Sequence, residues 1–163
     1  MSRPPQIAVI GKGASDPELA PLAEQVGRGL AEAGAVVVCG GLGGVMEAAA
    51  RGAAEAGGTV IGIVPSDDPA VANPYCTHVV ATGMGKARNL AVAASGDAVI
   101  AIGGEWGTLS EIAHARNFGR PVIALRSWRV ESAEPIAGDP GIRIADDPAA
   151  AVASALAAVE GSS

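Results

Sequence analysis

The chain has 163 residues, of which 49% are hydrophobic and 2% aromatic, and its formal net charge is −6. This length suits a single domain over residues 1–163 with one core that needs no metal or disulfide, while the negative charge and the scarcity of aromatic side chains exclude a nucleic acid partner. No apolar run reaches the about 18 residues that cross a bilayer and none resembles a signal peptide, so we expect a cytoplasmic protein without a membrane partner.

Strand-like and helix-like segments alternate along the chain. Short runs rich in Val and Ile predict strands, and uninterrupted runs of this kind are typical of parallel strands covered on both faces. Alanine-rich stretches of helical length lie between most of them. The strand runs are QIAVIG, AVVVCGG, TVIGIVP, HVVA, AVIAIGG and PVIAL, and the predicted helices cover about 17–33, 44–56, 86–95, 108–118 and 148–158. The pattern predicts an α/β protein with a doubly wound, mostly parallel sheet of about six or seven strands and helices on both faces.

The first strand is followed by GKGASDP. A dinucleotide-binding turn needs GxGxxG and an acidic residue after the second strand, and this chain has neither. Asp16-Pro17, like Asp147-Pro148, instead marks a helix start, because the carboxylate caps the helix and proline needs no N–H at the first helical position. We expect the loop with Gly11, Gly13 and Ser15 to line a ligand pocket at the carboxyl edge of the sheet.

The second strand run ends in VVVCGGLGGVMEAA. Glycines here let the backbone approach a ligand, and the helix that follows begins with free N–H groups and a dipole that favours an anion. The turn therefore predicts a phosphate-binding site, although the same glycines also suit a tight turn without a ligand. The candidate residues are Gly40, Gly41, Gly43 and Gly44.

Two cysteines, Cys39 in that run and Cys76, lack CxxC spacing and stand among apolar neighbours. We interpret both as reduced thiols that hold no metal. Cys76 belongs to the irregular segment 66–77, which we expect to be a loop beside the ligand pocket, and a second irregular loop covers 127–141.

A second glycine turn follows the fifth strand run, in GGEWGTLSEI. Gly103, Gly104 and Gly107 would form it, and Thr108 would cap the next helix or bind an anion. Because both glycine turns follow parallel strands, they lie at the same edge of the sheet. Glu111 fits a capping box with Thr108, in which the glutamate bonds back to the first amide of the helix.

Arg88 lies near the start of its helix in MGKARN, where a cation is unfavourable for the helix dipole. Such a residue suits bidentate binding of a phosphate or a heterocycle. A solvated surface arginine is the alternative. His114 matches no triad or metal pattern, and we interpret it as a half-buried helix residue.

Taken together, GGLGGVM, MGKARN and GGEWGTLSEI resemble the motifs of the LONELY GUY (LOG) family in the SLOG superfamily, which are GGGxxGLMG, an Arg-Lys helix start and PGGxGTxxE. The resemblance covers Val36 to about Leu125 and includes Met46 and Asp97. It implies a Rossmann-like fold, a homodimer or homotetramer, and hydrolysis of the N-glycosidic bond of a nucleoside 5′-monophosphate to free base and ribose 5-phosphate. No cofactor is implied.

By the same resemblance Arg88 and Glu111 would be the catalytic pair, with Gly104, Gly107 and Thr108 binding the phosphate. A carboxylate beside the sugar can stabilise an oxocarbenium-like transition state and deprotonate water. We expect the helix dipole to favour ionised Glu111, which suits a base better than an acid.

Glu105 departs from the family pattern, since it replaces the second glycine of PGGxGTxxE in the ligand-binding turn and would repel a phosphate unless it points away. The run GTLSEIA and the short chain also resemble a small bacterial branch related to molybdenum cofactor carrier proteins, which bind a phosphorylated pterin without turning it over. Carriage of molybdenum cofactor (molybdopterin) is thus the alternative function, and nucleotide sensing a more distant one. Related sequences have been labelled lysine decarboxylases, but the only lysines, Lys12 and Lys86, suggest no pyridoxal phosphate site.

Overall fold

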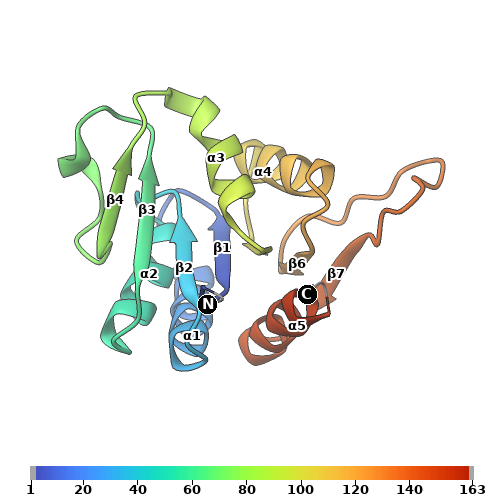
Figure 1. The fold of residues 1–163 in the computed structure, drawn as a ribbon, viewed down its shortest axis with the longest axis horizontal. Helices are drawn as coiled ribbons and strands as arrows, with labels where there is room; N and C mark the ends of the chain where they lie inside the picture. Colours follow the sequence, from blue (N-terminus) through green and yellow to red (C-terminus); the bar gives the residue numbers. More distant parts are fainter. Residues whose placement is uncertain (1–2, 162–163) are drawn as a thin grey trace.

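The computed structural model describes residues 3–161, which form one sheet of seven strands and five α-helices (Figure 1). The strands lie in the order β4-β3-β2-β1-β5-β6-β7, and every neighbouring pair is parallel. Their bounds are Gln6–Gly11 (β1), Val36–Cys39 (β2), Val60–Val64 (β3), His78–Ala81 (β4), Ala98–Ile102 (β5), Val122–Leu125 (β6) and Ile142–Ala145 (β7). The predicted doubly wound, Rossmann-like α/β fold is confirmed.

The helices cover the two faces of this sheet. On one face α1, α2 and α5 pack against a core that includes Ile7, Val9 and Leu30, and on the other α3 and α4 pack against Ala8, Ile10 and their neighbours. Alternate residues of β1 thus serve opposite cores, as a strand buried on both faces requires. The bounds are Leu19–Glu32 (α1), Val45–Glu55 (α2), Arg88–Ser95 (α3), Trp106–Asn117 (α4) and Pro148–Glu160 (α5), with short 3-10 turns at Pro69–Val71 (η1) and Gly85–Ala87 (η2).

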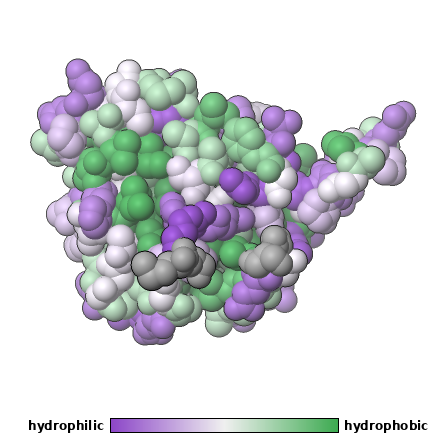
Figure 2. Space-filling model, viewed as in Figure 1, coloured by the Kyte–Doolittle hydropathy of each residue, from purple (hydrophilic) through white to green (hydrophobic). Residues whose placement is uncertain are grey.

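The edge strands are less well covered than the centre. β4 has no helix over it on the α3 side within the described residues, and Figure 2 shows hydrophobic side chains gathered over β3 and β4. Val80 in β4 and Leu90 in α3 are both more than 40% exposed. On the opposite edge, the segment between β6 and β7 projects away from the sheet (Figure 1).

Helices α1 and α2 pack with their backbones in contact. A Cβ added to Gly27 in α1 would lie 2.0 Å from the carbonyl oxygen of Ala49, and one added to Gly52 in α2 would lie 2.0 Å from that of Glu24. No side chain fits in either gap. Small residues thus let the layers of the fold approach closely, so that the core is filled without bulky aromatic side chains.

Three helices begin two residues away from their predicted starts, among them α3, which begins at Arg88 instead of at about 86. Asp16 does accept backbone N–H groups, from Glu18 and Leu19 at 3.0 and 3.1 Å, but α1 begins at Leu19. Helix α4 begins at Trp106, so the capping box is wrong: Thr108 is the third helical residue, and Glu111 lies in the second turn, beyond reach of the first amide. The glycine turn before it ends sooner than the sequence indicated. Asp147 caps α5 as predicted, accepting from the Ala150 amide at 2.8 Å.

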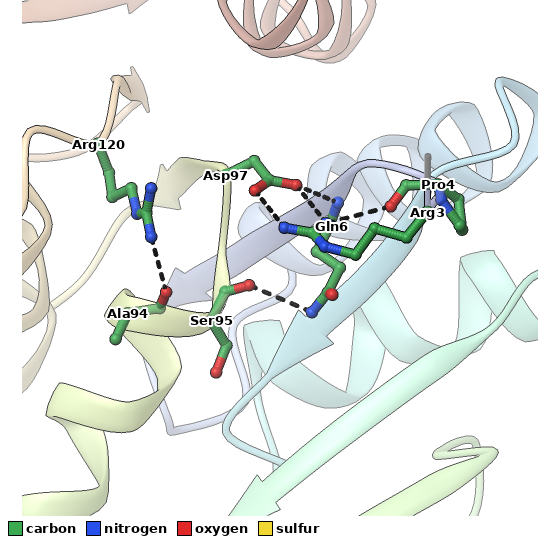
Figure 3. A network of polar contacts seen from close by, with 7 residues as sticks. All are labelled: Arg3, Pro4, Gln6, Ala94, Ser95, Asp97 and Arg120. Atoms are coloured by element: carbon green, nitrogen blue, oxygen red, sulfur yellow. Dashed lines mark hydrogen bonds and ion pairs between the residues drawn. The ribbon is translucent and has the colours of Figure 1, made fainter. Parts of the chain in front are cut away.

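The amino ends of β1 and β5 are joined by a polar network (Figure 3). Both carboxylate oxygens of Asp97 accept from the Arg3 guanidinium at 2.7 Å, and one also accepts the Gln6 amide at 2.9 Å. The Gln6 side chain donates to the Ser95 carbonyl at 3.2 Å. This network lies at the amino ends of the strands, opposite the glycine turns, and Asp97 has a structural role in it.

Candidate functional site

The carboxyl ends of β1, β2 and β5 bring three glycine-containing loops together. β1 lies between β2 and β5. Strands β2 to β4 are added on one side of β1 and strands β5 to β7 on the other, so the boundary between β1 and β5 is the switch point of the sheet. Ligands of open α/β sheets bind outside the strands at such a point. The loops after these strands therefore occupy the expected place.

A cleft of about 190 Å³ lies at this point. It is lined by Ile10, Gly11, Gly13, Gly40, Met46, Arg88, Asn89, Glu105, Gly107, Thr108 and Glu111. Four larger hollows, of about 570, 550, 430 and 310 Å³, contain none of the predicted site residues, and the first two lie beneath the segment between β6 and β7. The predicted site residues that line a hollow at all, Arg88 and Glu111 among them, therefore line the cleft of about 190 Å³.

Six predicted ligand residues do not line this cleft. They are Ser15, Gly41, Gly43, Gly44, Gly103 and Gly104. Three of these glycines are needed for packing instead: a Cβ would lie 2.2 Å from the Lys12 carbonyl oxygen at Gly44, 2.4 Å from the Leu19 side chain at Gly103, and 2.5 Å from the Thr108 side chain at Gly104. Each also has a positive φ, which favours glycine. These positions support the site rather than face it.

Contacts between backbones fix the three loops to one another. Gly44 touches the first loop, and the amide of Val45 donates to the Lys12 carbonyl at 2.9 Å. On the other side of β1, a Cβ on Gly11 would lie 2.2 Å from the Ile102 carbonyl oxygen. The walls of the cleft are therefore set by the fold.

Arg88 is the first residue of α3 and is buried, with 7% of its surface exposed. Its guanidinium lies where a side chain on Gly40 would be, since a Cβ there would be 2.3 Å from Nη1. Nη1 donates to Asn89 at 3.3 Å, while the buried Nε has no hydrogen-bond partner among residues 3–161. Burial lowers the pKa of Arg88, and Glu111 opposes that shift. The alternative of a solvated surface arginine is wrong.

Glu111 faces Arg88 across the cleft. Its Oε1 lies 4.0 Å from Arg88 Nη1, and the residue is only 6% exposed. Burial raises the pKa of Glu111 from 4.5 to about 7, although the Arg88 charge acts in the opposite sense. The expectation that the helix dipole keeps this carboxyl ionised is wrong, because Glu111 lies a turn inside the helix in a poorly solvated place. A carboxyl with such a pKa can gain or lose a proton near neutral pH.

Asn89 was not among the predicted site residues. It accepts from Arg88, and its side-chain amide donates to Ser110 Oγ at 3.4 Å, which in turn donates to the Gly107 carbonyl at 2.6 Å. These bonds connect the start of α3 to the start of α4. The sequence feature that could have indicated Asn89 as a site residue is its polar side chain directly after Arg88 in MGKARN.

Glu105 precedes α4 and lines the mouth of the cleft, where it is exposed. Its carbonyl oxygen accepts from Trp128 Nε1 at 3.2 Å and from the Leu109 amide at 3.0 Å. The Trp128 ring packs against Trp106, with centroids 5.3 Å apart. The backbone of this turn is therefore held by hydrogen bonds from Trp128 and Leu109, and Glu105 itself is one of the residues that line the cleft.

The amides of Trp106, Gly107 and Thr108 open α4 and have no carbonyl of their own helix to bond to. Gly107 and Thr108 line the cleft, and together with Arg88 they give this side of it donors suited to an anion. Over residues 3–161 no group of three or more His, Cys, Asp and Glu side chains is placed to hold a metal ion. Nor is any helix in that range long and apolar enough to cross a membrane.

Comparison with known proteins gives relatives along nearly the whole chain. An uncharacterised protein of Archaeoglobus fulgidus is 45% identical over 121 residues, which are 74% of this chain and 80% of that protein. The molybdenum cofactor binding protein of the phototrophic bacterium Rippkaea orientalis has 36% identity and a TM-score of 0.86, covering 96% of this chain and 98% of its own. The molybdenum cofactor carrier protein of Chlamydomonas reinhardtii has 30% identity and a TM-score of 0.83, covering 97% and 99%.

The model of the SLOG cluster4 family matches residues 4–152. That range includes the three loops and every residue that lines the cleft. The resemblance to the SLOG superfamily, which the three motifs predicted, is confirmed. The chain belongs to the SLOG cluster4 family.

Proposed function

We propose that the cleft binds the phosphate end of molybdenum cofactor, a phosphorylated pterin, and that the protein carries this ligand without changing it. The observation that carries the proposal is the buried guanidinium of Arg88, whose Nε lacks a hydrogen-bond partner among residues 3–161, and which lines the cleft together with Gly107 and Thr108 at the amino end of α4. A buried polar group without a hydrogen bond is costly, and an anion would provide the bond.

The size of the cleft agrees with a phosphate site. At about 190 Å³ it is below the roughly 300 Å³ at which pockets for whole small molecules begin. A phosphate and part of a ring would lie inside, and the rest of the ligand would lie over the loops at its mouth. Two similar proteins of known structure are described as binding or carrying molybdenum cofactor, which supports the same ligand here.

Retention of the ligand tests this function. The protein is mixed with molybdopterin and passed through a desalting column, and the retained pterin is measured by fluorescence after oxidation. We expect retention by the wild type and a loss of at least about tenfold in affinity for Arg88→Gln, since a charged hydrogen bond is worth roughly 1.5–3 kcal/mol. Lys86→Gln removes an exposed cation two residues away and serves as the matched control. Equal retention by Arg88→Gln would contradict the proposal.

A second function, hydrolysis of the N-glycosidic bond of nucleoside 5′-monophosphates, is favoured by one observation. Glu111 has a pKa of about 7 and lies opposite Arg88, an arrangement in which a carboxyl could exchange a proton while a cation neutralises the phosphate or the departing base. Chromatography of a panel of nucleoside monophosphates after incubation with the protein distinguishes the two functions. Release of free base that is lost in Glu111→Gln would establish the hydrolase, and tight retention of molybdopterin with no base released would support the carrier.

We also propose that the protein is a homo-oligomer. The apolar surface over β3 and β4, with Val80 48% and Leu90 42% exposed, is of the kind that monomers usually cover. Light scattering coupled to gel filtration measures the mass directly. A mass of one chain at micromolar concentration would contradict the proposal.

A further inference from the structure

Cys39 and Cys76 lie together on the sheet face covered by α1 and α2. Cys39 ends β2 and is paired in register with Gly62 of β3. A Cβ on Gly62 would lie 2.5 Å from Cys76 Sγ, so the Cys76 thiol fills the space of the side chain that Gly62 lacks. Cys39 belongs to the core cluster against which Cys76 packs. Neighbouring strands are about 4.8 Å apart, so the two thiols are side by side.

The two thiols differ in exposure and in acidity. Cys39 is fully buried, while Cys76 is only partly buried. A hydrogen bond between the two side chains lowers the pKa of Cys76, and the same bond together with burial raises the pKa of Cys39. The thiol that ionises more readily also belongs to the less buried residue, which is the division expected between an attacking and a resolving cysteine.

We propose that Cys39 and Cys76 are an oxidisable pair, which a peroxide converts into an intramolecular disulfide. The Cys76 thiolate attacks one oxygen of hydrogen peroxide, the O–O bond breaks, and hydroxide leaves with Cys76 as a sulfenic acid. The Cys39 sulfur then attacks the Cys76 sulfur, and the sulfenic oxygen leaves as water. Two thiols and one peroxide thus give one disulfide and two waters, with sulfur oxidised and oxygen reduced.

This pair is connected to the candidate ligand site through Asn73, which is 9% exposed. Asn73 donates from its backbone to Gly41 at 2.8 Å and from its side chain to Leu42 at 2.9 Å, and its Oδ1 accepts from Cys76 Sγ at 3.6 Å. Cys39 immediately precedes Gly40, over which Arg88 lies. A disulfide would therefore tie the loop 66–77 to the turn beneath Arg88, whatever ligand the cleft binds.

Counting thiols tests the pair in the full chain. The reduced protein is treated with a small excess of hydrogen peroxide, quenched with catalase and titrated for free thiols after denaturation. We expect both thiols of the chain to disappear, a disulfide between the peptides that contain Cys39 and Cys76 in the mass map, and full recovery with dithiothreitol. The Tm should rise by roughly 5 °C on oxidation, because the bond closes a long loop.

Single variants assign the two roles. Cys39→Ser should accumulate a sulfenic acid at Cys76 that dimedone traps, whereas Cys76→Ser should keep its Cys39 thiol at least about tenfold longer than the wild type keeps Cys76. The proposal is wrong if both wild-type thiols persist, if the disulfide forms only between chains, or if Cys76→Ser is oxidised as fast as the wild type. If a variant does not fold, the mass map and the thiol count of the wild type still decide.

Discussion

The carboxyl of Glu111 is buried beside Arg88, and its position makes the stability of the protein depend on pH. Its pKa is 4.5 in the ordinary state and about 7 in the fold. Between these values the folded chain binds more protons than the unfolded chain, so the free energy of unfolding falls as the pH rises from about 4.5 to about 7 and then levels off. The whole decrease is roughly 3 kcal/mol.

Urea unfolding of the wild type and of Glu111→Gln between pH 4.5 and 8 measures this dependence. We expect the decrease to be largely absent from Glu111→Gln, since the amide does not titrate. Glu160→Gln, which changes an exposed carboxyl at the end of α5, should behave as the wild type does. Parallel curves for the wild type and Glu111→Gln would show that Glu111 is ionised normally.

Glu105 adds a negative charge to the lining of a cleft whose hydrogen-bond donors suit an anion. We expect Glu105→Gln to bind inorganic phosphate about two- to fivefold more tightly at low salt, an effect that salt should weaken because the residue is exposed. Isothermal titration at two salt concentrations measures it, with Glu134→Gln on the projecting segment as control. Weaker phosphate binding by Glu105→Gln would mean that this carboxylate helps to hold the ligand.

At the scale of residues, the spacing of the motifs predicted Arg88 and Glu111 as site residues, and both line the cleft. The environment of Glu111 was predicted wrongly, because the same short sequence can form a capping box or contain a buried carboxyl. Only the position of the helix start distinguishes the two. For a similar reason, five of the glycines predicted to bind the ligand do not line the cleft. Whether a glycine admits a ligand, a guanidinium as at Gly40, or a neighbouring backbone as at Gly44 depends on loops far apart in sequence.

At the scale of elements, the contact between α1 and α2 depends on single glycines. We expect Gly27→Ala to destabilise the protein by about 2–3 kcal/mol. The added methyl group in α1 would overlap the Ala49 carbonyl oxygen of α2 and force the two helices apart. Gly29→Ala in the same helix meets a methyl group of Val152 at 3.3 Å rather than a backbone atom, and it gains helix propensity, so it should change stability by less than about 1 kcal/mol. Thermal unfolding of both variants makes the comparison, and equal effects would contradict it.

The strands at the centre of the sheet and β4 at one edge were predicted from the sequence, but β7 at the other edge was not. β5 is buried at every position and appears as a continuous apolar run, AVIAI. β7 has the sequence IRIA with Arg143 and Ile144 exposed, and it was not among the predicted strand runs. An edge strand lacks neighbours on one side, so its sequence is not forced to be apolar.

At the scale of the whole molecule, the network at Asp97 joins the start of the chain to the middle of the sheet. The hydrogen bond from Arg3 lowers the pKa of Asp97, so its contribution to stability is present above the ordinary pKa of 3.8 and is lost as the pH falls below it. Because Glu111 acts in the opposite direction, stability should be greatest near pH 4–5 as far as these two groups determine it.

We expect Asp97→Asn to lower the free energy of unfolding at pH 7 by about 1 kcal/mol, as one exposed ion pair and part of a backbone hydrogen bond are lost. The loss should shrink as the pH falls below 3.8, because the carboxylate of the unfolded wild-type chain takes up a proton before the folded one does. Asp67→Asn, in an exposed loop, is the control. Unfolding curves at pH 3.5 and 7 measure both, and a pH-independent difference would indicate that charge has no part in it.

The backbone contacts among the three loops determine how quickly a ligand can bind. Gly11 against Ile102 and Gly44 against Lys12 leave the cleft walls little freedom to rearrange, so its shape should exist before a ligand arrives. Association would then be a single step whose observed rate rises linearly with ligand concentration, without a plateau from a slow conformational change. Differences in affinity among ligands should appear as differences in dissociation rate, and the lifetime of the complex would decide how far a carried molecule travels before it is released.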